Sequence, residues 1–150
     1  MKFFTFTGVL LFLFSFVNSC LVHKLAPEEV YINEDSCAFC KMLISDIRFS
    51  AQLLSPEQET KKFDDVVCLL NYLATQSQSG EEAIYVHLFE QKGWTKAQSA
   101  TYLVSENIST PMGSGICAFL DRGEAEYAKE TYGGRILTWK ELLSEFTRFD

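Results

Sequence analysis

The chain has 150 residues, of which 47% are hydrophobic and 14% aromatic, so it can bury a core and is not a disordered polymer. Its 20 acidic and 13 basic residues give a formal net charge of −7 at pH 7. Because like charges repel, this acidic balance excludes nucleic acid and anionic membrane surfaces as favoured partners.

Residues 1–19 have the pattern of an export signal. Lys2 is their only charged residue and precedes the apolar run FFTFTGVLLFLFSFV, while Val17 and Ser19 supply small side chains before a cleavage point. A transmembrane helix needs about 20 apolar residues, which disfavours an uncleaved anchor. The segment ends in FVNSC, which resembles a bacterial lipobox, so we expect cleavage before Cys20 and lipid on its sulfur. The alternative is an ordinary cleaved signal with Cys20 as an unpaired thiol.

Lipidation would place the protein on a membrane facing the periplasm. Removal of the first 19 of 150 residues leaves 131, held at Cys20 by acyl chains. Leu21 and Val22 carry no acidic retention signal, which favours the outer membrane. Residues 20–34 have weak hydrophobic periodicity and are predicted to form a tether. The folded domain is therefore expected over 35–150.

The first half of this domain predicts the order strand, strand, helix, strand. The expected elements are a strand over 47–53, a turn over 55–58, a strand in ETKKFD, a helix over 65–76 and a strand over 83–89. In the helix, apolar side chains from Val66 to Leu73 recur at i, i+3, i+4 and i+7, with Asp64 or Asp65 as the N-cap.

The second half repeats this order. Its expected elements are strands over 99–105 and 115–120, a helix over 123–132, a strand in RILT and a last helix through Phe146. Asp121 is the expected N-cap of the first of these helices, Gly133 and Gly134 end it, and TWKE is a capping box for the second. We therefore predict an α+β fold of two similar ββαβ units, about 35–92 and 93–150, packed together with a C-terminal helix. Each unit alone is too small to bury a core well.

The four cysteines beyond Cys20 fall into two classes. Cys68 in VVCLL and Cys117 in GICAFL lie in apolar runs and are interpreted as small buried hydrophobic residues. Cys37 and Cys40 in DSCAFCKM have polar neighbours and precede the first predicted strand. The chemistry of the chain is therefore expected at the second pair.

Three kinds of site compete for Cys37 and Cys40. A redox pair should follow a strand and open a helix, whereas CAFCKM runs into a strand. A structural zinc site needs four Cys or His ligands, usually in two pairs. This chain has no second pair, His23 is isolated, and His87 alternates within IYVHLF as a face residue of a strand. The third kind is a soft-metal site in which thiolate and thioether bind Cu(I).

The methionines favour the soft-metal site. Beyond residue 19 the chain has only Met42 and Met112. Met42 follows Cys40 by two residues, so at strand spacing their side chains point the same way. Met112 lies in the polar loop SENISTPMGSG, where no hydrophobic period would bury it. Both methionines are thus candidate ligands.

Four blocks of the sequence resemble a known family. EDSCAFCKMLISDIRFSAQL, KKFDDVVCLLNYL, STPMGSGICAF and YGGRILTWKEL are similar to successive blocks of NosL, the copper-chaperone lipoprotein of nitrous oxide reductase maturation. The likeness spans roughly residues 34–143. It implies two ββαβ units and Cu(I) carried on a periplasmic or outer-membrane lipoprotein, with ligands corresponding to Cys40, Met42 and Met112. The family usually has Gly after the second cysteine, where this chain has Lys41, a residue that makes the local backbone less permissive.

The resemblance and the residues together predict a membrane-tethered Cu(I) chaperone without catalytic activity. Its copper acceptor would be nitrous oxide reductase or a similar periplasmic enzyme. The Cys40 thiolate would dominate binding, Met42 and Met112 would add neutral soft donors, and Cys37 is a further candidate ligand or redox partner. One alternative is a periplasmic thiol–disulfide oxidoreductase that uses Cys37 and Cys40. Another is a lipoprotein that binds a partner and whose cysteines form a structural disulfide.

Overall fold

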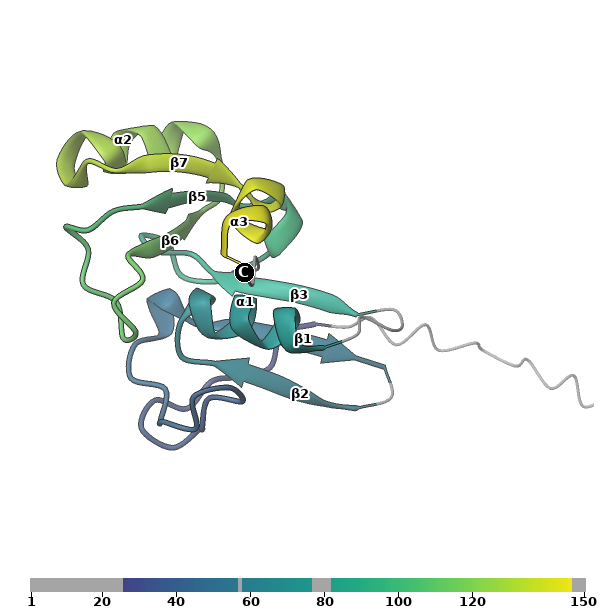
Figure 1. Ribbon diagram of the computed structural model, residues 1–150. Coiled ribbons are helices and arrows are strands. Elements are labelled where there is room, and N and C mark those ends of the chain that lie inside the picture. The colour runs from purple at the N-terminus through teal and green to yellow at the C-terminus, as the bar shows by residue number, and fades with distance from the viewer. Residues whose placement is uncertain (1–25, 57, 77–81, 147–150) are drawn as a thin grey trace, which may run out of the picture.

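The computed structural model describes residues 26–56, 58–76 and 82–146 (Figure 1). The predicted export signal and the lipidation site at Cys20 lie outside these residues, so both stay predictions. Among the helices within the described ranges, none has the length and apolar character required to cross a bilayer.

The first unit is a four-stranded antiparallel sheet with one helix. Its elements are β1 (Ala51–Ser55), β2 (Gln58–Phe63), α1 (Val66–Thr75), β3 (Ala83–His87) and β4 (Trp94–Lys96). The strand order is β2-β1-β3-β4. The central strand β1 therefore pairs with the second and third strands of its unit, both antiparallel.

The second unit repeats the ββαβ order in a three-stranded sheet. Its elements are β5 (Thr101–Val104), β6 (Ile116–Phe119), α2 (Arg122–Tyr132), β7 (Arg135–Thr138) and α3 (Trp139–Phe146). The strand order is β6-β5-β7, so the first strand is again central and antiparallel to its neighbours. The predicted α+β fold of two ββαβ units with a C-terminal helix is confirmed.

Three short elements differ from the sequence prediction. Residues Ile47–Phe49 form a 3₁₀ turn, η1, rather than the start of β1, because the Asp46 side chain accepts a hydrogen bond from the Arg48 amide and turns the chain. The three-residue strand β4 and the 3₁₀ turn η2 (Ala97–Ser99) were not expected. An alternating pattern must extend over at least four residues to indicate a strand, so the sequence does not predict an element of three residues.

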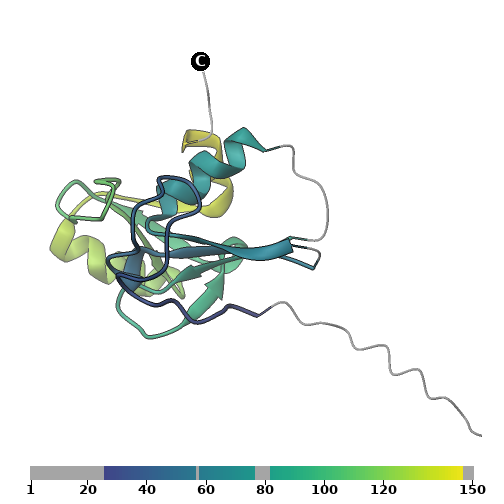
Figure 2. The same ribbon diagram turned by 90° about the horizontal axis from the view of Figure 1, so that it is seen from below.

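The two units share the larger of two core clusters. A single cluster of buried side chains joins α1 and the first sheet to residues of the second unit, among them Tyr102, Ile116, Trp139 and Leu142. Figures 1 and 2 show α1 over the first sheet with α3 of the second unit beside it. The sheets also meet through the backbone, where the Phe89 amide donates to the Ala118 carbonyl at 2.9 Å. The apolar face of the first sheet and α1 is therefore completed by side chains of the second unit.

Residues before the cysteines lie against the first sheet. The Glu28 amide donates to Oε1 of the buried Gln52 at 2.9 Å, and Gln52 Nε2 donates back to the Glu28 carbonyl at 2.7 Å. Val30 is buried beyond them. Part of the predicted 20–34 tether is thus attached to the domain, and its first residues, 20–25, lie outside the described ranges.

Candidate metal site

A short hairpin loop carries the first two cysteines. Ser36 and Leu43 form an antiparallel bridge, and the Cys37 amide donates to the Met42 carbonyl at 2.8 Å. The turn closes where the Lys41 amide donates to the Cys37 carbonyl at 3.1 Å. Cys37 and Cys40 therefore lie at the two ends of one tight turn, with no helix attached.

Lys41 adopts a left-handed conformation at the end of this turn. Its φ is 67°, a value that favours glycine. The Lys41 ammonium donates to the Ala38 carbonyl at 2.7 Å, which returns the side chain over the turn. Lys41 is the residue at which the sequence departs from the family pattern. It is also the residue of this loop where glycine would relieve strain.

Helix α1 supplies a third cysteine. Asp65 is its N-cap, with a side chain that accepts from the Val67 amide at 3.0 Å, and Cys68 follows in the first turn. The Ala38 amide donates to the Lys62 carbonyl at 2.8 Å, which fixes the cysteine loop to the end of β2 just before the helix. The loop and the first turn of α1 are therefore adjacent.

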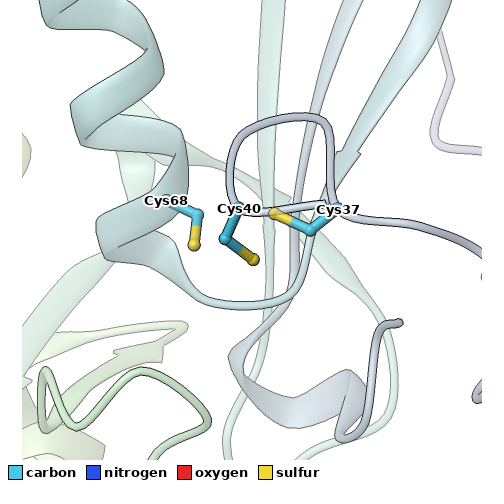
Figure 3. A group of neighbouring side chains, drawn as sticks. All are labelled: Cys37, Cys40 and Cys68. Carbon is cyan, nitrogen blue, oxygen red and sulfur yellow. The ribbon is translucent and has the colours of Figure 1, made fainter. Parts of the chain in front are cut away.

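The three thiols converge. The Sγ atoms of Cys37, Cys40 and Cys68 all lie within 4.8 Å of one another. Figure 3 shows Cys68 on the helix and the other two on the facing loop, with their sulfur atoms in the space between. Cys37 and Cys68 are each 1% exposed, whereas Cys40 is partly exposed. All three are free thiols here, so the cluster can hold a metal ion.

The three thiols differ in their pKa values. A hydrogen bond from the Cys68 thiol lowers the pKa of Cys37 to about 5, and the main-chain amides of Asp64, Cys40 and Phe39 act in the same direction against burial. Donating that bond, together with burial, raises the pKa of Cys68. Burial also raises the pKa of Cys40. A thiolate is therefore favoured at Cys37 and disfavoured at Cys68 and Cys40.

The methionine loop of the second unit is tied to the same helix end. The Met112 amide donates to Asp65 Oδ2 at 3.1 Å, and the Ser114 hydroxyl donates to Asp65 Oδ1 at 2.7 Å. Asp65 is fully buried. The structure thus brings the main chain at Met112 to the residue that caps the helix of Cys68.

The side chains of both methionines face outward. Met112 is 41% exposed and Met42 is 49% exposed. Met42 belongs to the cysteine loop itself, and Met112 lies on the loop bound to Asp65. The ligand set of Cys40, Met42 and Met112 stays a prediction.

Cys68 is the residue of this cluster that sequence reasoning missed. Its apolar neighbours in the sequence predict that it is buried. They do not predict that its sulfur faces Cys37 and Cys40, because that depends on the packing of the loop against α1. Cys117 does match its interpretation as a buried hydrophobic residue, since it lies in a separate core cluster beside Phe119 and Leu103. The one signal in the sequence was the predicted N-cap Asp65, which placed Cys68 in the first turn of the helix.

Comparisons with known proteins agree with this architecture. The family model of NosL matches residues 30–147. A crystal structure of the copper chaperone NosL from Shewanella denitrificans is 21% identical in sequence, covers 77% of this chain and 94% of that chain, and superposes with a TM-score of 0.67. At this identity the likeness shows a common fold. No curated protein matches the sequence.

Proposed function

Because the chain belongs to the NosL family, we propose that it binds Cu(I) and passes it to a copper-accepting protein. The observation that carries the proposal is the convergence of Cys37, Cys40 and Cys68 within 4.8 Å. Thiolates and thioethers are soft donors that select Cu(I) over harder cations. A protein of this kind transports the metal and catalyses no reaction.

Release requires donors that an acceptor can reach. Cys40 is the partly exposed member of the thiol cluster, and Met42 and Met112 expose 49% and 41% of their surfaces. Neutral thioethers bind Cu(I) without adding charge, so an incoming ligand can displace them. These three residues are the proposed exchange ligands.

The proposed acceptor is a periplasmic copper enzyme such as nitrous oxide reductase. This assignment rests on the resemblance of the sequence to NosL lipoproteins. The segment FVNSC supports export and a lipid anchor at Cys20, with the outer membrane as the proposed location. An anchor of this kind would keep the copper site in the compartment of its acceptor.

An oxidoreductase would place different demands on the same cysteines. The lowered pKa of Cys37 suits an attacking thiolate. Yet Cys37 is only 1% exposed, so the disulfide of a substrate protein cannot reach its sulfur. The site therefore fits metal binding better than disulfide exchange.

Anaerobic titration of the reduced full chain with Cu(I) against a chromophoric chelator tests the proposal. Wild-type protein is expected to compete for the metal, and Cys40→Ala is expected to lose at least about tenfold in affinity, equivalent to one ligand interaction of 1.4 kcal/mol. Cys117→Ala removes a buried thiol outside the cluster and serves as the matched control. Equal uptake by wild type and Cys40→Ala would contradict the proposal.

A further inference from the structure

The sulfur donors of this protein form two layers that differ in access to solvent. Cys37 and Cys68 are 1% exposed, Cys40 is partly exposed, and the two methionines are 41% and 49% exposed. Cys40 is the member that borders both layers. A single coordination sphere cannot easily use all five sulfur atoms, because Cu(I) takes few ligands in soft-donor sites.

We propose that Cys37, Cys40 and Cys68 form an inner binding position for a monovalent soft cation, separate from an outer position made by Cys40, Met42 and Met112. The inner position retains the ion and the outer position transfers it. Cys40 belongs to both, so the ion moves between them without leaving its thiolate. This inference rests on the proposed function and names how the site stores its cargo.

The geometry of the inner position suits a three-coordinate ion. With metal–thiolate bonds of about 2.3 Å, the length that zinc forms, a trigonal arrangement sets sulfur atoms about 4 Å apart. The sulfur atoms here lie within 4.8 Å of one another, close to that spacing. Two of the three come from a closed turn and the third from a capped helix, so the donors are held on ordered backbone.

The surroundings offset the negative charge of a thiolate cluster. The main chain at Asp64, Cys40 and Phe39 favours a thiolate at Cys37 and lowers the pKa of that thiol. Cys68 lies in the first turn of α1, where the aligned peptide dipoles leave positive charge. Backbone donors remain in place whether or not a metal is bound, so they favour a buried anionic site of this kind.

Selenomethionine labelling separates the two positions. In the full chain grown with selenomethionine, X-ray absorption at the selenium edge detects copper that contacts a methionine side chain, and the Met42→Ser/Met112→Ser variant assigns the contact to these two residues rather than to Met1. At half an equivalent of Cu(I) the wild type is expected to show no copper–selenium contact. Cys68→Ala and, independently, Cys37→Ala should show that contact and an affinity lowered at least about tenfold. Cys117→Ala should behave as the wild type.

The double variant Met42→Ser/Met112→Ser tests the other direction. It should release the first equivalent of Cu(I) to a chelator about tenfold more slowly than wild type. A copper–selenium contact of equal strength in wild type and Cys68→Ala would overturn the inner position while leaving copper binding intact. Absence of Cu(I) binding by wild type would instead overturn the proposed function.

If Cys68→Ala fails to fold by circular dichroism, Cys37→Ala decides the question. Cys37 lies in the loop that packs against α1 and not in the helix itself, so its replacement leaves the helix sequence unchanged. The same selenium measurement then applies, and an unchanged spectrum counts against the inner position.

Discussion

Lys41 shows how one backbone angle can cost stability beside a binding site. A non-glycine residue in the left-handed region is disfavoured by about 1–2 kcal/mol because Cβ approaches the following carbonyl. The φ of 67° at Lys41 falls in that region. The hydrogen bond from the Lys41 ammonium to the Ala38 carbonyl recovers part of this cost, but only part, because both groups are exposed.

Lys41→Gly is therefore expected to stabilise the reduced protein by about 0.5–1 kcal/mol. The gain from relieved strain exceeds the entropy that glycine adds to the unfolded chain. Urea unfolding measures the difference. Lys41→Ala is the control, since it removes the ammonium but keeps Cβ, and it should be no more stable than wild type. A Lys41→Gly protein less stable than Lys41→Ala would refute the strain.

His87 is the second residue whose environment has a measurable consequence. It is buried, its Nδ1 lies 2.9 Å from the Leu88 carbonyl, and its Nε2 lies 3.3 Å from the Gly93 amide. Both bonds are satisfied when Nδ1 carries the proton and Nε2 accepts. Burial lowers the pKa of His87, against the hydrogen bond to the Leu88 carbonyl and the charge of Asp46, which both raise it.

Stability should accordingly fall as the pH drops below about 6.5, the ordinary pKa of histidine in an unfolded chain. In that range the unfolded state binds a proton that the folded state does not, so the free energy of unfolding decreases by at most about 1.4 kcal/mol per pH unit. Urea unfolding from pH 7.5 to 5.5 measures the slope for wild type and for His87→Gln. Equal slopes in the two proteins would show that His87 titrates normally.

At the scale of elements, the N-terminal turn of α1 connects three segments. Its cap, Asp65, binds the helix through the Val67 amide and the second unit through Met112 and Ser114. Asp121 caps α2 at the equivalent place, where its side chain, among the described residues, accepts from the Glu124 amide alone, at 3.0 Å. One aspartate is thus a cap alone, and the other is a cap and an anchor.

Replacing each aspartate with serine separates these roles. Serine caps helices about as well as aspartate, so Asp121→Ser should change stability by only a few tenths of a kcal/mol. Asp65→Ser keeps the capping oxygen but loses Oδ2, and leaving the Met112 amide without its partner should cost about 1–3 kcal/mol. Hydrogen exchange at Met112 and Gly113 should accelerate in Asp65→Ser alone. Protection equal to wild type would show that the loop does not depend on Asp65.

Local patterns predicted those elements whose cause is local. The capping box at the start of α3 is present, with the Thr138 amide donating to Glu141 at 2.8 Å, and Asp65 and Asp121 are the N-caps of α1 and α2. The thiol cluster could be predicted only in part. Cys37 and Cys40 are neighbours in sequence, whereas the position of Cys68 depends on long-range packing that no periodicity encodes.

At the scale of the whole molecule, the shared core couples the two units. Leu142 of α3 and Leu69 of α1 are fully buried in one cluster. The ring centroids of Tyr102 in β5 and Trp139 in α3 lie 5.8 Å apart. A division of the chain between β4 and β5 would expose the apolar faces of both units. The two ββαβ repeats are consequently one cooperative structure.

The two tryptophans offer a test, because Trp94 lies in the first sheet and Trp139 in α3. In Trp94→Phe the fluorescence reports on Trp139, and in Trp139→Phe it reports on Trp94. Within each variant, fluorescence and far-UV circular dichroism should give the same urea midpoint. Distinct midpoints in either protein would mean that the units unfold separately.

Asp65 binds the main-chain amide of Met112 and does not constrain the Met112 side chain. Any amino acid except proline supplies the amide that Asp65 Oδ2 accepts at 3.1 Å. The identity of the donor at this position is therefore uncoupled from the folding of the loop. Histidine or cysteine could replace methionine there without moving the backbone, and the preference of the protein for one metal over another could change while its architecture stays the same.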